Sequence, residues 1–262
     1  MAIATLDQLI AAAKQVTPYY KASATSKGAG SFHSLWTVAG FPGAGAAAGT
    51  AAGAACNNTT VGSFPWVSPG GANLAYLAAL ELAGATIGNF ILYDRLVHTS
   101  TLSGTVTTAQ TVNSAALTRY TTGDDVECWL EFYSATGATG VTATISYTNE
   151  AGTAGRSGSA AVVATTVAGQ LIPMTLQAGD KGVRSVQSVT LSATTGTAGN
   201  FGITLMKRLA HIPNMVANVG QLLDFGSTGL PEVVSGACLA LAVLCSATNT
   251  GIVTGAVKTA EG

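Results

Sequence analysis

The chain has 262 residues, a formal net charge of −1, 32 glycines and charged side chains at 9% of its positions. An ordinary globular domain carries about 25% charged residues, so we expect this surface to be covered by copies of the chain or by a partner. Apart from the pair Lys207–Arg208, no basic cluster suits nucleic acid. The longest uncharged apolar run, Ala237 to Leu244, is far below the ~20 residues of a membrane helix. The composition favours a building block of an assembly over a diffusing enzyme.

The first predicted element is a helix over residues 5–16. Thr5 and Gln8 have the spacing of a capping box, and the apolar residues at 6, 9, 10 and 13 form one stripe. We expect the helix to end before Pro18, which cannot continue it. The residues before the helix lack the basic segment of a secretory signal, so secretion is not expected.

Residues 18–66 are predicted to form an extended arm. Their centre, residues 40–56, is rich in glycine and alanine, as in a flexible linker, but it is apolar where flexible linkers are polar. Bulky aromatic residues flank it on both sides. We therefore expect an arm that lies against a partner and predict the partner-binding residues Phe32, Trp36, Phe41, Phe64 and Trp66. A floppy linker is the alternative.

The next predicted element is a short helix over residues 73–83, with Asn73 as its cap and Gly84 as its end. From there on, Thr- and Val-rich segments separated by Gly turns predict an antiparallel sandwich. The expected strands are 88–98, 104–112, 126–134, 141–148, 160–166, 171–176, 183–193, 201–209 and 237–254.

The clearest strand is 126–134, where two kinds of residue alternate. Val126, Cys128, Leu130 and Phe132 share one face, and Glu127, Trp129, Glu131 and Tyr133 share the other. Such alternation is typical of an antiparallel sheet with one buried face and one face open to solvent or to a partner. The partner-binding prediction therefore includes Trp129 and Tyr133.

A search for catalytic chemistry finds little. His33, His98 and His211 are scattered, no nucleotide loop or nucleophile elbow is present, and Asp124-Asp125 has no calcium-loop spacing. We predict no catalytic residue, no metal site and no cofactor. Glu127 and Glu131 flank an aromatic residue, as in sugar-binding sites, but positions four apart on a strand lie about 13 Å from each other, too far for a glycosidase pair.

The four cysteines, Cys56, Cys128, Cys238 and Cys245, have no metal-binding spacing. We interpret them as reduced core residues of a protein that folds in a cytosol. A bridge between Cys238 and Cys245 is disfavoured, because an odd offset along a strand directs the two side chains to opposite faces.

The segment from Ile145 to Ser157 contains the pattern Tyr-Thr-Asn-x-x-Gly-x-x-Gly-Arg, starting at Tyr147 and ending at Arg156. This segment resembles a strand-and-turn signature of virion structural proteins of tailed bacteriophages, and the Gly/Ala/Thr-rich, charge-poor composition is similar too. Within that group the resemblance is greatest to head decoration (cement) proteins. It implies a β-sandwich body, arms that reach over neighbouring subunits, frequent trimers and no catalytic residues.

Together these features predict a mainly β chain with an antiparallel, jelly-roll-like sandwich body over residues 87–262, preceded by a helix and arm over residues 1–86. The expected function is a non-enzymatic virion protein that binds the capsid exterior and stabilises contacts between capsid subunits. Its expected partners are the major capsid protein and itself, as a trimer, with neither nucleic acid nor membrane. Its expected place is the virion, assembled in the host cytoplasm. The alternatives are a tail, collar or baseplate component and a carbohydrate-binding adsorption protein.

Overall fold

The computed structural model describes residues 3–262, so Met1 and Ala2, the first residues of the expected N-terminal segment, lie outside it. The elements in chain order are α1 (Leu6–Ala11), β1 (Ala13–Lys21), β2 (Phe32–Ser34), β3 (Gly40–Phe41), β4 (Ala54–Ala55), β5 (Ala75–Gly84), β6 (Gly88–His98), β7 (Gln110–Thr111), β8 (Val126–Ser134), β9 (Val141–Asn149), β10 (Arg156–Val162), β11 (Gln170–Pro173), β12 (Val183–Leu191), β13 (Asn200–Asn214), β14 (Gln221–Asp224), α2 (Phe225–Thr228), β15 (Leu239–Cys245) and β16 (Val253–Glu261). The predicted mainly β, antiparallel architecture with a small N-terminal helix is confirmed. Within residues 3–262, neither helix is long and apolar enough to cross a membrane.

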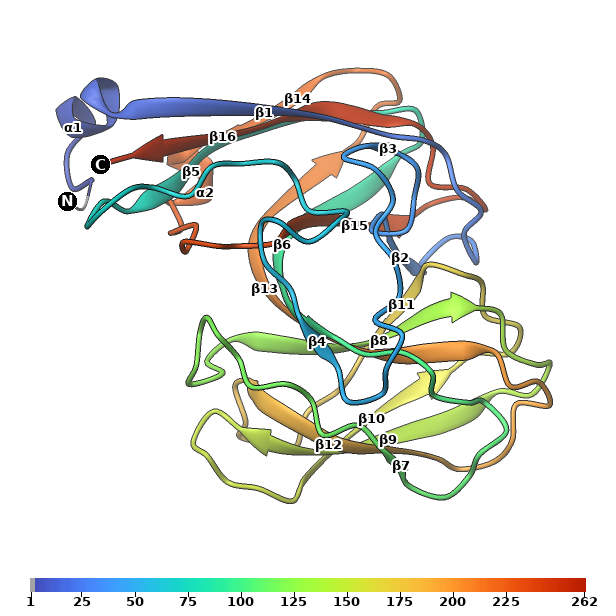
Figure 1. Ribbon diagram of the computed structural model, residues 1–262. Helices are drawn as coiled ribbons and strands as arrows, with labels where there is room; N and C mark the ends of the chain where they lie inside the picture. Colours follow the sequence, from blue (N-terminus) through green and yellow to red (C-terminus); the bar gives the residue numbers. More distant parts are fainter. Residues whose placement is uncertain (1–2) are drawn as a thin grey trace.

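Three sheets build the molecule, one above another in Figure 1. Within the described residues the upper sheet has the order β14-β5-β16-β1-β3, and the lower sheet has the order β10-β9-β12-β7. Between them lies β13-β8-β11-β2-β15-β6-β4, in which β13 also pairs with β6. That extra pairing closes six of these strands into a ring, a central barrel.

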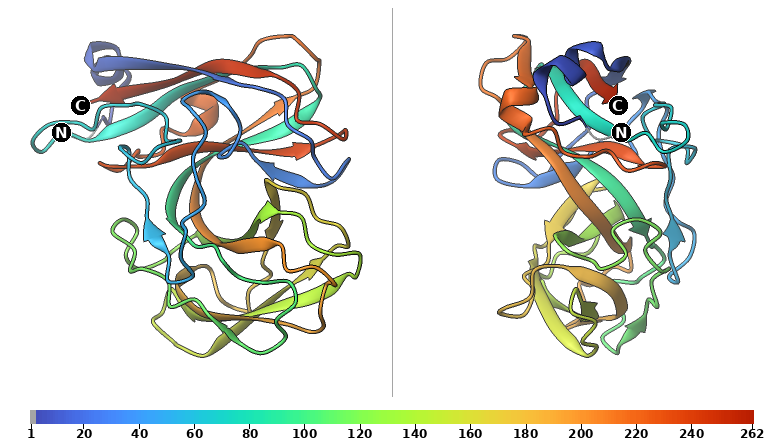
Figure 2. Two further views of the ribbon diagram at one scale, coloured as in Figure 1. Left: turned by 45° about the vertical axis from the view of Figure 1, so that its right-hand side comes forward. Right: turned by 90° about the vertical axis from the view of Figure 1, so that its left-hand side faces the viewer.

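The barrel wall packs against a sheet on each side. Above it, apolar residues of β6, β13 and β15 pack against the upper sheet and form one core. Below it, apolar residues of β8 and β13 pack against the lower sheet and form a second core. A third cluster fills the barrel interior. The molecule is therefore two sandwiches that share a barrel, and Figure 2 shows the resulting elongated shape from two further sides.

The strand faces predicted from alternation are half right. In β9, the residues Val141, Ala143, Ile145 and Tyr147 are buried, and the threonines and the serine that alternate with them are exposed or half-buried, as expected. In β8, however, Trp129 and Glu131 of the supposedly open face are also buried. They point into the barrel, because β8 forms part of a closed wall whose two faces are both covered.

The predicted boundary between residues 86 and 87 does not separate two units. β1 pairs with β16 along its whole length, from Ala13 opposite Glu261 to Lys21 opposite Val253. β5 pairs with the other edge of β16. Segments near the two ends of the chain therefore lie side by side in one sheet (Figure 1), and residues 18–66 are not a detachable arm.

Two helix predictions need correction. α1 keeps its capping box, with Gln8 N–H donating to Thr5 Oγ1 at 3.2 Å, but it ends at Ala11, and residues 13–21 form β1. Residues 75–84 are a strand despite their helix-favouring alanines and leucines. Leu77, Leu80 and Leu82 are buried against the barrel, and this tertiary packing outweighs the weak intrinsic preference for helix.

Candidate interaction surfaces

The outer face of the upper sheet exposes an unusual number of apolar side chains. Leu6 (57% exposed) and Ile10 (66%) project from α1, and Val16 (57%) projects from β1. These side chains line a groove with a volume of about 420 Å³. Phe225 (42% exposed) of α2 and Ala78 and Ala79 of β5 also line this groove. Leu222 (63%) extends the apolar surface along β14. We call the set Leu6, Ile10, Val16, Leu222 and Phe225 the apolar face.

The charges of this face are few and largely engaged. Lys258 donates a hydrogen bond to Glu81 on the neighbouring strand, so the two charges at the centre of the sheet neutralise each other. Lys14 Nζ donates to the carbonyl oxygens of Ile10 and Ala12 at 2.9 and 3.0 Å, at the C-terminus of α1. This position suits a cation, because the helix dipole is negative there. The face therefore offers mainly apolar contact.

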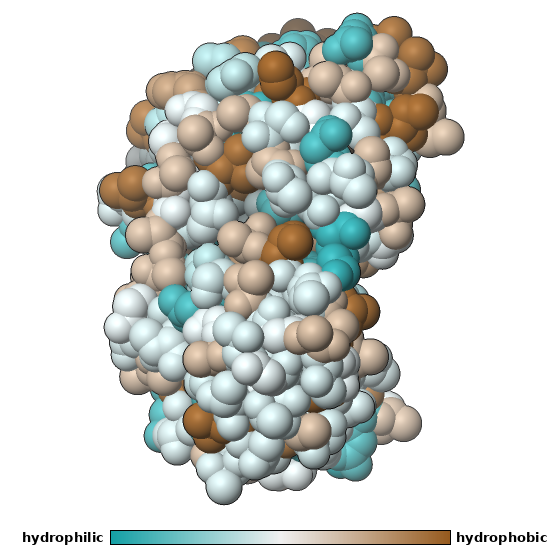
Figure 3. Space-filling view, turned by 90° about the vertical axis from the view of Figure 1, so that its right-hand side faces the viewer, coloured by the Kyte–Doolittle hydropathy of each residue, from teal (hydrophilic) through white to brown (hydrophobic). Residues whose placement is uncertain are grey.

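Figure 3 shows one side of the molecule coloured by hydropathy. Most of the lower half is pale, which means residues of intermediate hydropathy, and strongly hydrophilic residues appear in isolated spots. Brown, hydrophobic groups gather towards the upper end. This distribution agrees with the low content of charged residues, 9%.

The predicted aromatic contact residues are mostly internal. Trp36, Phe64, Trp66 and Trp129 are at most 3% exposed, so they pack in their own chain and cannot present a contact surface to a partner. For Trp36 the reason is the neighbouring glycines: Gly45 and Gly62 leave room for its ring to lie against the backbone. Phe41 is 51% exposed. Phe32 and Tyr133 are half-buried.

A buried ion pair occupies the barrel interior. Arg95 Nη2 donates to Glu131 Oε2 at 2.6 Å, and both side chains are 0% exposed. The same nitrogen lies 3.0 Å from Tyr133 Oη and 3.0 Å from His98 Nδ1, while Thr204 Oγ1 donates to the Glu131 carboxylate. Although burial alone would raise it, the Arg95 charge keeps the pKa of Glu131 below its ordinary value. These residues hold β6, β8 and β13 together.

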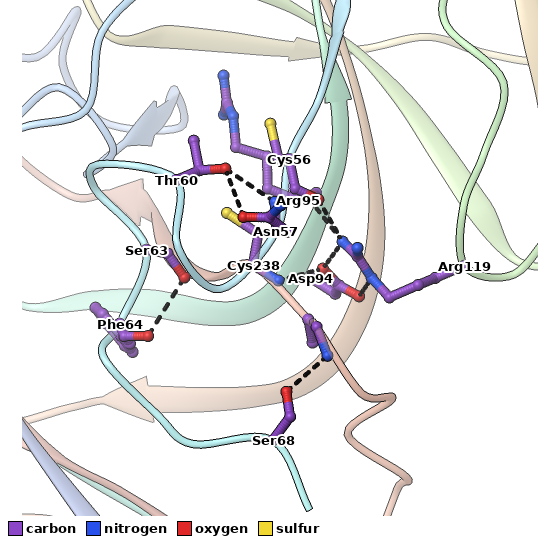
Figure 4. Close-up of polar contacts among 12 residues, drawn as sticks. Cys56, Asn57, Thr60, Ser63, Phe64, Ser68, Asp94, Arg95, Arg119 and Cys238 are labelled. Carbon is purple, nitrogen blue, oxygen red and sulfur yellow. Dashed lines mark hydrogen bonds and ion pairs between the residues drawn. The ribbon is translucent and has the colours of Figure 1, made fainter.

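A second buried polar contact lies beside it (Figure 4). Arg119 Nε and Nη2 donate to the two oxygens of Asp94, each at 2.8 Å. The Cys238 amide donates to the same carboxylate at 2.8 Å, and Arg119 Nη2 also donates to the Cys56 carbonyl at 2.9 Å. Arg119 therefore ties the loop before β8 to β6 and to the segment that follows β4, and Asp94 joins the residue before β15 to the same contact.

The thiols of this contact are shielded from solvent. A hydrogen bond from the Cys238 thiol lowers the pKa of Cys56, yet the two residues are only 1% and 0% exposed, so the chain itself encloses both thiols. All four cysteines are free and buried, as predicted. Within residues 3–262, no group of three or more His, Cys, Asp or Glu side chains could hold a metal ion.

The two acids beside Trp129 do not form one site, as their spacing along the strand predicts. Glu131 points into the barrel, whereas Glu127 lies in a cleft of about 370 Å³ with Arg208 and Lys181. Glu127 accepts from Trp129 Nε1 at 2.9 Å and from Arg208 Nε at 2.9 Å. Because Trp129 is only 2% exposed, it offers no open ring on which a sugar could stack.

The Tyr-Thr-Asn…Gly-Arg segment acts as a clamp on one distant carboxylate. Tyr147 Oη donates to Asp180 Oδ2 at 2.5 Å, Asn149 Nδ2 donates to Oδ1 at 2.8 Å, and Arg156 donates to both oxygens at 2.9 and 2.8 Å. The Asp180 side chain is 3% exposed. The motif thus fixes the turn between β9 and β10 to the loop before β12, a structural role that spacing alone does not reveal.

Replacing Asp180 with asparagine is expected to lower stability at neutral pH and to flatten its pH dependence. The Arg156 hydrogen bonds hold the pKa of Asp180 below its ordinary value of 3.8. Because the pKa of Asp180 is lower in the folded state than in the unfolded state, the ionised carboxylate stabilises the fold at pH values above its ordinary pKa. This contribution is lost progressively as the pH falls below about 4. Urea unfolding at pH 7 and pH 3 should show a wild-type advantage that shrinks at pH 3. Asp125→Asn, at a side chain that is 78% exposed, is the control. An advantage of equal size at both pH values would contradict this role.

No protein-family model and no curated protein matches the chain. Among solved structures, it is similar to the crystal structure of the infectious bursal disease virus VP2 subviral particle, with 10% identity and a TM-score of 0.24, covering 99% of this chain and 82% of that chain. The structure of infectious bursal disease virus Gx strain has 11% identity and a TM-score of 0.23, and the match covers 95% of this chain and 80% of that chain. The crystal structure of the T13 particle of the same virus has 9% identity and a TM-score of 0.22, and the match covers 95% of this chain and 77% of that chain. At these identities and scores no family is established for the chain.

Proposed function

We propose that this chain is a non-enzymatic structural subunit of a virus particle. The observation that carries the proposal is the apolar face, whose five side chains are 42–66% exposed and come from α1, α2 and two strands of the upper sheet. Isolated soluble proteins rarely leave a large contiguous apolar patch uncovered, and such patches mark interaction sites. The scarcity of charge on the rest of the surface and the resemblance of the Tyr147–Arg156 segment to phage virion proteins support the same conclusion.

The finer proposal is a decoration protein on the capsid exterior. The apolar face would bind the major capsid protein, and as a decoration protein the chain would also associate with itself as a trimer. Occupancy of many equivalent sites stabilises the assembled shell over its dissociated subunits, by RT ln(1 + [L]/Kd) for each site. Since the face has few free charges, attachment should depend mainly on apolar burial and change little with salt, which screens exposed charges.

Re-addition to stripped particles tests this function. Purified particles that have lost the protein should rebind it at both low and high salt, and their temperature of thermal disruption should rise. If stripped particles resist heat equally well and lose only host attachment, an adsorption protein replaces this proposal. A copy number far below that of the capsid subunits would indicate a tail, collar or baseplate component.

A surface substitution sharpens the same experiment. Leu222→Asp, on the apolar face, should weaken particle binding about tenfold or more, because full burial of a leucine contributes about 1.5–3 kcal/mol and 1.4 kcal/mol equals a factor of ten. Val163→Asp is the matched control, since Val163 is 43% exposed and follows β10 in the lower sheet. Equal binding by both variants would exclude the apolar face as the contact.

A further inference from the structure

The upper sheet ends in an open strand edge. β1 pairs with β16 on one side, and on its other side β3 pairs with Tyr20 and Lys21 alone. On the side away from β16, residues 13–19 therefore have no strand beside them within residues 3–262. In Figure 1 this part of β1 forms the border of the sheet next to α1. An open edge presents unpaired N–H and C=O groups and is a template for pairing with another strand.

The position of Pro18 shows which groups point outward. Proline has no N–H, so within a sheet its nitrogen faces an open edge. On the same side of the strand, Ala22 N–H donates to Ala39 O beyond the end of β3 at 2.9 Å. The even-numbered residues therefore direct their polar groups away from β16. The open edge offers the N–H groups of Lys14 and Val16 and the carbonyl oxygens of Lys14, Val16 and Pro18.

We infer that this edge pairs with the same edge of a second copy, antiparallel about a two-fold axis at Val16. In this register Val16 exchanges two hydrogen bonds with Val16 of the other copy, and each Lys14 N–H donates to a Pro18 carbonyl. The N–H groups of Lys14 and Val16 in both copies, four in all, then have partners. Pro18 has no N–H, so no donor at that position is left unpaired. The two upper sheets become one continuous sheet.

The length of the open edge selects a second copy as the occupant. Pairing about Val16 places residues 13–19 against residues 19–13, so each copy covers the whole open stretch of the other. At one end α1 ends before residue 13, and at the other end the pairing of β1 with β3 begins at Tyr20. Neither element collides with the partner strand, because each lies just outside the paired stretch. A register shifted by one pair would bring Ala11, the last residue of α1, into the pairing.

The charges and apolar groups along the edge agree with this pairing. Lys14, the one charged residue at positions 13–19, lies four residues from its symmetry mate along the strands, about 13 Å, which exceeds the Debye length of about 8 Å at physiological salt. Leu6 and Ile10 of one copy come next to Tyr20 (42% exposed) and Phe41 (51%) of the other. The exposed aromatic Phe41 thereby gains a contact that its own chain does not supply.

Light scattering on the purified full-length chain tests the inference. Val16→Lys places two like charges opposite each other and should halve the mass of the assembly that the chain forms with itself. A dimer would become two monomers, or a hexamer would become two trimers. Val163→Lys, at an exposed valine in the lower half, should keep the wild-type mass. Circular dichroism of both variants checks that they remain folded.

Mixing two variants provides the decisive result. Val16→Lys and Val16→Glu should each dissociate alone, and a mixture should recover the full mass, because opposite charges then face each other across the axis. A wild-type mass that Val16→Lys leaves unchanged would overturn the inference, as would a mixture that stays dissociated. These masses are measured without capsids, so a chain that pairs but fails to bind particles refutes the proposed function and leaves this contact standing.

Discussion

Glu131→Ala is expected to destabilise the folded chain by about 3–5 kcal/mol, because it leaves the guanidinium of Arg95 buried and without its counter-charge. Both side chains are 0% exposed and lie 2.6 Å apart. A neutral group at the closest approach does not restore the lost counter-charge, and three strands lose their shared contact. Urea unfolding of the two proteins at neutral pH measures the difference.

The matched control is Glu127→Ala, four residues earlier on the same strand. Its partner, Arg208, is 43% exposed and Glu127 itself is 31% exposed, so this surface pair should contribute less than about 1 kcal/mol. The double variant Arg95→Met/Glu131→Met removes both buried charges, so it should be less destabilised than the single variants Arg95→Met and Glu131→Met, each of which leaves one charge unpaired. Equal losses for Glu131→Ala and Glu127→Ala would show that Glu131 does not face a sealed interior.

Local pattern was sufficient to predict several strands. Residues 88–98 and 126–134 were predicted with the bounds that the structure has, because alternation and Gly turns mark such segments without help from the rest of the chain. The same pattern could not tell a solvated face from the inside of a barrel. Glu131 looks like a surface residue in sequence, and only ring closure through the β13–β6 pairing buries it.

Long-range pairing was the part that sequence could not supply. β1 and β16 lie more than 230 residues apart in the chain and yet pair residue by residue. The Asp180 clamp is similar, since Tyr147 and Arg156 approach a carboxylate 33 and 24 residues away. One local signal was available: Asp94 and Arg95 interrupt an apolar strand in a chain with few charges, and buried charges are almost always paired.

The aromatic residues of the expected arm show why the candidate site was misplaced. Bulky side chains beside a Gly/Ala-rich stretch suggest a segment without its own core. In the structure the glycines serve the opposite purpose. A Cβ on Gly45 would lie 2.2 Å from Trp36, so glycine there lets the ring pack against the backbone. Small residues thus allow dense packing, and the chain itself covers the aromatic groups that the prediction assigned to a partner.

Trp36→Ala should therefore cost about 3–5 kcal/mol of stability, the range for a large buried aromatic residue. Trp36 is 1% exposed. Its Nε1–H donates to Ala46 O at 2.9 Å, and the Arg95 guanidinium lies 4.5 Å from its ring centroid. The substitution would open a cavity, remove a hydrogen bond and take away the aromatic surface over a buried cation. Urea unfolding measures the loss.

Phe41→Ala is the comparison that separates a core residue from an interface residue within the same segment. Phe41 is 51% exposed, so its loss should change the free energy of unfolding of the monomer by less than about 1 kcal/mol, since exposed positions away from special features tolerate substitution. It should weaken association of copies instead, because the proposed pairing buries it. If Trp36→Ala kept full stability and abolished only particle binding, residues 18–66 would be a partner-binding arm after all, and the packing of this segment against the barrel would be wrong.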